Sequence, residues 1–190
     1  MPNLDQIILF IRNFIATEFD AELARLCAPD RKTFREKASK VDAFCSSALA
    51  GTISRPMHVS AKELEETKEQ AMASKPRTLF EVREYRHPQH GELFRCYLSD
   101  LTRWPKGTRY SESKYVAQTD DGLKIIASYR ICFACCGFGT CEGKKCRDCG
   151  GLGWQPAGGV EFAMLGKLVA VRKLEPPTNP ADLPLYESMT

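Results

Sequence analysis

The chain has 190 residues, of which 43% are hydrophobic and 27% are charged, a composition typical of a soluble globular protein with one sizeable core. Its net charge of +3 is too small to indicate a nucleic-acid ligand by itself, and no apolar run approaches the roughly 20 residues of a membrane span. Nine cysteines, an odd number, favour a reducing compartment over a disulfide framework. Because the N-terminus has no basic n-region and acidic Asp5 precedes the apolar run, we expect a cytoplasmic protein without a secretory leader.

Apolar residues recur at helical spacing in two N-terminal segments, residues 4–19 and residues 34–50. Asp30 supplies an N-cap for the second helix, and Gly51 ends it. We expect both apolar faces to be buried, with Cys45 as a small core residue. A partner-binding surface is the alternative for the first helix.

The middle of the chain changes its period from helical to alternating. Residues 52–59 are expected to be short and extended, and a capping box at Ser60 predicts a third helix to about residue 74. Alternation then predicts strands at 79–85, 92–98, 110–119 and 123–131, with turns at 87–91 and 120–122. A further β-like run covers 160–173, and an aperiodic tail follows from 175 to 190.

This order predicts an α+β fold with N-terminal helices packed on a curved antiparallel sheet. The order and the strand sequences resemble the nuclear-transport-factor-2-like, cystatin-type cone over residues 1–131. More narrowly, they are similar to bacterial toxin-immunity proteins of that fold; the matching strand segments are Phe80–Tyr85, Gly91–Tyr97, Tyr115–Gln118 and Gly122–Ile126. The resemblance implies a cone-like domain that dimerises through its sheet.

A short unit, CxxCxGxG, occurs twice in the 22 residues from Cys132 to Gly153. Two CxxC turns at this spacing supply four thiolates for a tetrahedral zinc ion, with Zn–S bonds of about 2.3 Å. The glycines suit the positive φ that such turns require. The predicted ligands of this zinc knuckle are Cys132, Cys135, Cys146 and Cys149.

The sequence also allows other roles for the cysteines. Two disulfides or a redox-active CxxC are alternatives, and Cys136 or Cys141 could replace one ligand. Four thiolates leave a net charge of −2 on a Zn²⁺ site, which neighbouring Lys144, Lys145 and Arg147 would offset. Because four cysteines close the coordination shell and no histidine lies near them, we expect a structural zinc.

The CxxCxGxG repeat resembles that of the cysteine-rich domain of DnaJ chaperones. The resemblance implies metal binding by the four cysteines but no chaperone function, since His87-Pro88 is followed by Gln89 and no J-domain is present. The predicted organisation is therefore a domain at 1–131, the zinc knuckle at 132–154, a β-like extension at 155–174 and a flexible tail at 175–190.

No catalytic set stands out in the sequence. The histidines, His58, His87 and His90, lie on predicted turns or short extended segments, where we expect them to be inert. Tyrosines on the strands could line a pocket, although strand tyrosines more commonly belong to a core. We therefore expect a protein without catalytic residues.

The sequence favours a non-enzymatic, bacterial protein-binding module with a structural zinc site, and a toxin-immunity role is the candidate that the resemblance suggests. Its partner would be another protein, contacted by the knuckle side chains Phe133, Phe138, Leu152 and Trp154. The alternative interpretation is that these side chains cap the end of the sheet. Nucleic acid and membrane are disfavoured, and a homodimer is compatible with the fold. The alternatives are a small-molecule enzyme or binder using the cone pocket, and a nucleic-acid or unfolded-chain binder using the knuckle.

Overall fold

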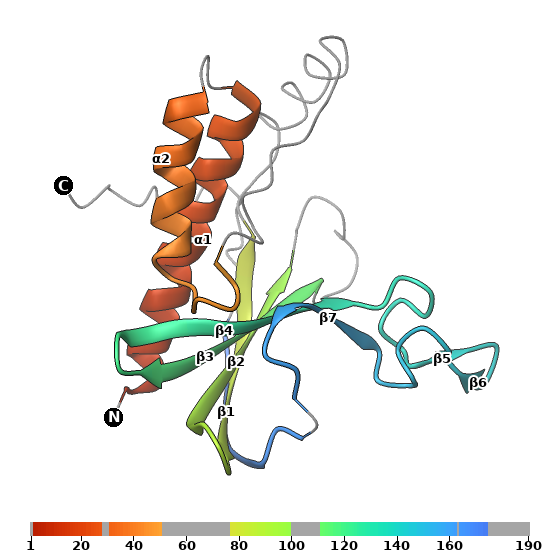
Figure 1. Ribbon diagram of the computed structural model, residues 1–190. Helices are drawn as coiled ribbons and strands as arrows, with labels where there is room; N and C mark the ends of the chain where they lie inside the picture. The colour runs from red at the N-terminus through yellow and green to blue at the C-terminus, as the bar shows by residue number, and fades with distance from the viewer. Residues whose placement is uncertain (1, 28–30, 51–76, 100–110, 163, 175–190) are drawn as a thin grey trace.

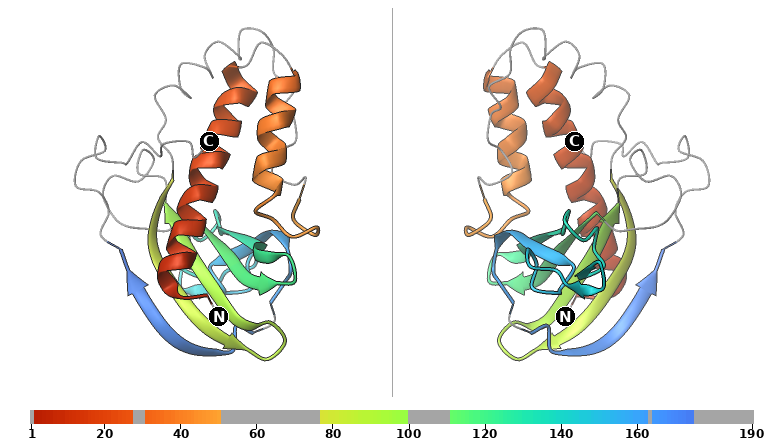
Figure 2. Two further views of the ribbon diagram at one scale, coloured as in Figure 1. Left: turned by 90° about the vertical axis from the view of Figure 1, so that its left-hand side faces the viewer. Right: turned by 90° about the vertical axis from the view of Figure 1, so that its right-hand side faces the viewer.

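The computed structural model describes residues 2–27, 31–50, 77–99, 111–162 and 164–174. In these residues the fold is α+β, with two helices against one face of a six-stranded antiparallel sheet (Figures 1 and 2). The elements are α1 Leu4–Cys27, α2 Arg31–Asp42, β1 Thr78–His87, β2 Gly91–Ser99, β3 Glu112–Thr119, β4 Gly122–Ile131, β5 Thr140–Cys141, β6 Lys144–Lys145, β7 Trp154–Gly159 and β8 Lys167–Lys173. The strand order of the large sheet is β7-β4-β3-β2-β1-β8, and β5 pairs only with β6.

Helix α1 confirms the first predicted helix and continues beyond it. Asn3 and Gln6 cap its start reciprocally, each side chain accepting a 2.9 Å hydrogen bond from the other residue's backbone N–H. Ile7, Ile11 and Phe14 are fully buried against the sheet, so the apolar face predicted from spacing belongs to the core.

Helix α2 ends at Asp42, and the prediction that it continues to about residue 50 is wrong. The chain turns instead, because the edge of β4 takes up its backbone groups. The Ile125 N–H donates to the Phe44 carbonyl at 2.8 Å, and the Ser46 N–H donates to the Ile125 carbonyl at 2.9 Å. Cys45, between them, is buried in the core as predicted.

The four predicted strands of the meander correspond to β1, β2, β3 and β4, each antiparallel to the next. The turn at 88–90 and the turn at Asp120-Asp121 lie where the sequence placed them. Gly122 ends the second turn with φ +95°, a value that glycine adopts without a Cβ penalty. Val82, Phe94 and Val116 face the helices and complete the core.

The prediction of one β-like run at 160–173 is wrong in its boundaries. Strand β7 extends from 154 to 159 beside β4, residues 160–162 and 164–166 lie on the crossing between the two edges, and β8 pairs with β1 at the opposite edge. Glycines allow the chain to pass closely at both ends of this crossing. A Cβ at Gly159 would lie 2.2 Å from the Ile126 carbonyl oxygen, and one at Gly166 would lie 2.2 Å from that of Arg86.

The crossing segment covers a second apolar cluster on the sheet face opposite the helices. Phe162 packs on Tyr115 with ring centroids 4.8 Å apart, and its N–H donates to the Tyr129 hydroxyl at 3.0 Å. Val160 and Leu165 pack on the same cluster. The strand tyrosines therefore belong to a core, as the sequence favoured.

His87 is buried and is the last residue of β1, whereas the sequence predicted that it begins the turn at 87–91. Its Nδ1 accepts hydrogen bonds from the N–H groups of Gln89 and His90, so Nε2 carries the proton and donates to the Met164 carbonyl at 3.1 Å. His87 thus fixes its own turn and attaches the crossing segment to it.

Several predictions lie outside the described residues: the Asp30 cap, Gly51, the segment 52–59 with His58, the third helix at 60–74 and the tail at 175–190. Among the described helices, none has both the length and the apolar character needed to span a bilayer.

Candidate metal centre

Residues 132–153 form a knuckle between β4 and β7, which pair at their ends through Ile131 and Trp154. Figure 1 shows the knuckle, with β5 and β6, projecting beyond the end of the sheet and away from the helices. The knuckle is therefore a separate extension at the end of the sheet.

The four predicted cysteines meet at the centre of the knuckle. The Sγ atoms of Cys132 and Cys146 are 3.8 Å apart, those of Cys135 and Cys149 are 3.7 Å apart, and all four lie within 4.8 Å of one another. A tetrahedron with Zn–S bonds of 2.3 Å has edges of about 3.8 Å. The four thiols, all buried, could therefore hold one tetrahedral metal ion.

The two halves of the knuckle are built alike, with equivalent residues 14 positions apart. In each half, the carbonyl of the first cysteine, Cys132 or Cys146, accepts a hydrogen bond from the N–H of the glycine five residues later. The carbonyl of the second cysteine, Cys135 or Cys149, accepts one from the N–H of the residue three positions later. Each half also donates to the other, from the Cys132 N–H to the Gly153 carbonyl at 2.9 Å and from the Cys146 N–H to the Gly139 carbonyl at 2.8 Å. The repeat in the sequence is thus an approximate two-fold repeat in space.

The second glycine of each unit is required by both conformation and space. Gly139 and Gly153 have φ +75° and +76°, and a Cβ on either would lie 2.4 Å from a backbone oxygen, of Gly151 and Gly137 respectively. Their N–H groups point at the thiols, donating to Cys135 Sγ at 3.3 Å and to Cys149 Sγ at 3.1 Å. These donors would stabilise thiolate charge in the metal-bound state.

Cys136 and Cys141 lie outside the four-thiol cluster. Their thiols donate to backbone carbonyls, of Phe133 at 3.6 Å and of Ala134 at 3.4 Å. No disulfide joins Cys45, Cys96 or the six cysteines of the knuckle, and the Sγ–Sγ distances within the cluster are well above the roughly 2.05 Å of a disulfide. A redox-active CxxC normally exposes a thiol, whereas these four are buried.

The thiols differ in acidity when no ion is present. The backbone N–H of Cys149 lowers the pKa of Cys146 to about 7. For Cys132 the N–H of Cys135 acts in the same direction, but burial and hydrogen bonds from neighbouring thiols outweigh it and raise the pKa to about 12. An incoming ion must therefore displace protons from the cluster.

The surface of the knuckle carries exposed apolar and basic side chains. Phe133, Phe138 and Leu152 are 69%, 62% and 77% exposed. Lys144 and Lys145 are exposed as well. Because Phe133, Phe138 and Leu152 are exposed, they do not cap the end of the sheet.

Trp154 differs from the other apolar residues named for the knuckle. It is half-buried, packs edge-on against Tyr97 with ring centroids 5.9 Å apart, and lies beside the Arg95 guanidinium. Trp154 therefore closes the end of the sheet.

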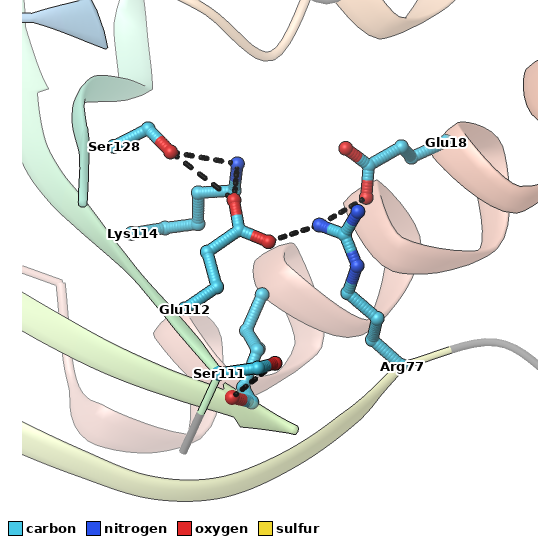
Figure 3. A network of polar contacts seen from close by, with 7 residues as sticks. Glu18, Arg77, Ser111, Glu112, Lys114 and Ser128 are labelled. Carbon is cyan, nitrogen blue, oxygen red and sulfur yellow. Dashed lines mark hydrogen bonds and ion pairs between the residues drawn. The ribbon is translucent and has the colours of Figure 1, made fainter. Parts of the chain in front are cut away.

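Sequence reasoning missed a second polar cluster, between α1 and the sheet (Figure 3). Arg77 pairs with Glu18 of α1 at 3.3 Å and with Glu112 of β3. Lys114 pairs with Glu112 and donates to the Ser128 hydroxyl at 3.0 Å, and Ser128 donates to Glu112 at 3.1 Å. The sequence could have indicated this cluster. Glu112 and Lys114 lie four and two residues before buried Val116, so alternation along a strand places all three on the same face of the sheet.

The two carboxylates of this cluster have opposite pKa shifts. Burial raises the pKa of Glu18, against the opposing effects of Arg77 and Lys114. Burial acts in the same direction on Glu112, but Lys114 and Arg77 outweigh it and hold the pKa of Glu112 below its ordinary value. Two cations matched to two carboxylates attach α1 to the sheet.

Comparison with known proteins finds no matching family model, no similar curated protein and no similar solved structure for this chain. The interpretation of the site therefore depends on its geometry and chemistry.

Proposed function

We propose that this protein is a non-enzymatic protein-binding module in which a structural Zn²⁺ fixes a knuckle that contacts the partner. The observation that carries the proposal is the exposure of Phe138 and Leu152, 62% and 77%, on a segment whose buried side chains are cysteines. Exposed apolar groups on a rigid support are typical of binding surfaces.

Zinc is the ion that the donor set fits best. Four thiolates in a tetrahedral arrangement are typical of structural zinc, with iron–sulfur sites as the other common class. Four protein ligands leave no position for a water or a substrate, so the ion would hold the knuckle in shape rather than take part in a reaction.

The repeat places the two exposed residues at equivalent positions. Gly139 packs against Gly151, and Gly153 packs against Gly137, so the residues between them, Phe138 and Leu152, occupy facing positions on the two glycine turns. Each is a large apolar side chain held by a backbone that the metal would fix. This pair, with Phe133 nearby in sequence, is the proposed contact surface.

The described residues offer less support for a small-molecule pocket. A depression of about 480 Å³ lies near the start of α1, and no titratable side chain lines it; the lining residues are Pro2, Gln6, Leu9, Phe10, Asn13, Gln118 and Leu123. Glu18 and Glu112, the carboxylates between α1 and the sheet, are already paired with cations.

The test is capture of a partner by immobilised full-length protein. The double variant Phe138→Ser and Leu152→Ser should keep its zinc but lose the stoichiometric partner that the wild type retains. Leu9→Ser is the matched control, because Leu9 is also apolar and 58% exposed but lies on α1.

Retention of the same partner by the double variant would contradict the proposal. Oligonucleotide binding that falls steeply with salt would instead support the nucleic-acid alternative, since phosphate contacts release counterions.

A further inference from the structure

Strand β8 forms one edge of the large sheet, at the opposite side from β7 and the knuckle. It pairs with β1 on one side, and no described strand lies on its other side. Figure 2 shows β8 in blue along the outer border of the sheet. An unpaired edge presents a row of backbone donors and acceptors to other chains.

Strand β8 carries accessible apolar side chains among its basic residues. Leu168, Val169 and Val171 are 47%, 49% and 47% exposed, so apolar groups are accessible on a strand of seven residues. The opposite edge is different, since β7 contains Pro156 and ends in two glycines, which weaken strand pairing. The sheet therefore has one protected edge and one that can accept a further strand.

The register shows which backbone groups of β8 point outward. Leu174 donates to the Phe80 carbonyl at 2.7 Å, and Arg172, two residues earlier, is paired with Val82, two residues after Phe80. Since hydrogen-bonding direction alternates along a strand, Arg172 bonds towards β1 and the backbone groups of Val171 and Lys173 face outward.

The charges of β8 indicate the chemistry of the strand that would fit. Lys167, Arg172 and Lys173 are basic and the strand has no acidic residue. A second copy pairing antiparallel about Ala170 would place Lys167 opposite Lys173, and like charges in facing positions are destabilising. An incoming strand with an apolar centre and carboxylates at its ends avoids this repulsion.

We propose that β8 binds an extended, acidic-ended segment of another protein, which adds to the sheet as a seventh strand. Main-chain hydrogen bonds to Val171 and Lys173 would supply affinity, and the terminal lysines would select carboxylates. The site is at the other edge of the sheet from the metal centre and does not depend on the proposed function of the knuckle.

The test uses a fluorescent seven-residue peptide with glutamate at both ends and alternating valine and threonine between them. The control peptide has lysine at both ends. At low salt, fluorescence anisotropy should show saturable binding of the glutamate peptide, at least tenfold tighter than that of the lysine peptide. Removing metal with a chelator should leave this binding unchanged, which separates it from the knuckle.

Two variants locate the interaction on β8. Val171→Pro removes an outward N–H that β1 does not use, and should abolish peptide binding while the thermal midpoint stays close to that of the wild type. Val171→Thr, which keeps the N–H, should bind as the wild type does. The double variant Lys167→Glu and Lys173→Glu should bind the lysine peptide in preference.

Three results would overturn the proposal. These are equal binding of both peptides, unchanged binding by a folded Val171→Pro variant, and a dimer in sedimentation that Val171→Pro dissociates, which would assign the edge to a second copy. If Val171→Pro does not fold, the charge-reversed variant decides, because unchanged peptide preference there also contradicts the proposal.

Discussion

The helix–sheet region and the knuckle bury very different kinds of side chain. Ile7, Ile11 and Phe14 are fully enclosed between α1 and the sheet, whereas the side chains enclosed in the knuckle are four cysteines. The large apolar residues of the knuckle point to solvent instead, as the exposure of Phe138 shows. Apolar burial accounts for the first region, since it contributes about 25 cal/mol per Å², but it cannot account for the second.

The difference means that the two regions should respond to different perturbations. A structure held by an ion is conditional on that ion, because binding free energy becomes folding free energy. A structure held by an apolar core does not depend on a ligand. Changes to the metal site should therefore spare the core, and changes to the core should spare metal binding until the whole chain unfolds.

The largest effect is expected from Cys149→Ser, which removes one of the four proposed metal ligands. Structural zinc contributes about 10–16 kcal/mol in small zinc modules, so its loss should unfold the knuckle. Hydrogen exchange should show lost protection over residues 132–153 and retained protection in α1 and β2. Cys136→Ser, outside the cluster, should keep both metal and protection. Global unfolding of Cys149→Ser would show that the regions are not independent.

The converse change is Lys114→Met, in the cluster between α1 and the sheet. Breaking a buried ion pair costs about 3–5 kcal/mol, because Glu112 loses a cation that offsets its charge. Urea unfolding should show this loss while metal content stays that of the wild type. The matched control is Lys37→Met, whose pair with Asp20 is exposed and should contribute at most about 1 kcal/mol. Equal losses in the two variants would contradict the structural role of the buried cluster.

A smaller effect within the knuckle is expected from Gly153→Ala. The added methyl would meet the Gly137 carbonyl and displace the N–H that points at Cys149, so metal affinity should fall about 10–100-fold. Gly143→Ala is the control, because Gly143 also has positive φ but its Cβ would meet no atom within 4 Å. Competition with a chromophoric chelator measures both. Similar affinity losses would mean that backbone conformation, not the packing of the two halves, is what matters.

The smallest effect concerns the pH dependence of the core. The folded pKa of Glu18 is raised, so its contribution favours folding below the unfolded pKa and is lost as pH rises through the folded pKa. Glu18→Gln should therefore gain stability relative to the wild type as pH rises from the ordinary value of 4.5 towards the folded pKa. The lowered pKa of Glu112 gives the opposite sign, and Glu112→Gln should lose stability relative to the wild type as pH rises from the folded pKa to the ordinary value of 4.5, with no further change above it. Urea midpoints below and above pH 4.5 would decide, and parallel curves for the two variants would contradict the assigned directions.

Local sequence patterns predicted the parts of the molecule that local physics determines. The spacing of apolar residues gave α1 and the four meander strands, and the CxxCxGxG repeat gave the four clustered thiols and the glycines with positive φ. In each case the residues that define the feature are close together in the sequence.

The parts that were missed depend on contacts between distant segments. Helix α2 stops early because β4, some eighty residues later, takes up the backbone of Phe44 and Ser46. The crossing from β7 to β8 depends on close passage at Gly159 and Gly166, and His87 is buried only because that crossing covers it. Periodicity within one segment carries no information about such contacts.

The most direct test of the account is metal analysis of freshly purified, reduced full-length protein, combined with cobalt substitution. The account predicts equimolar zinc that Cys149→Ser lacks, and a cobalt spectrum with the thiolate charge-transfer bands of tetrahedral S₄ coordination. Protein that contains no metal while residues 132–153 remain protected from hydrogen exchange would contradict it.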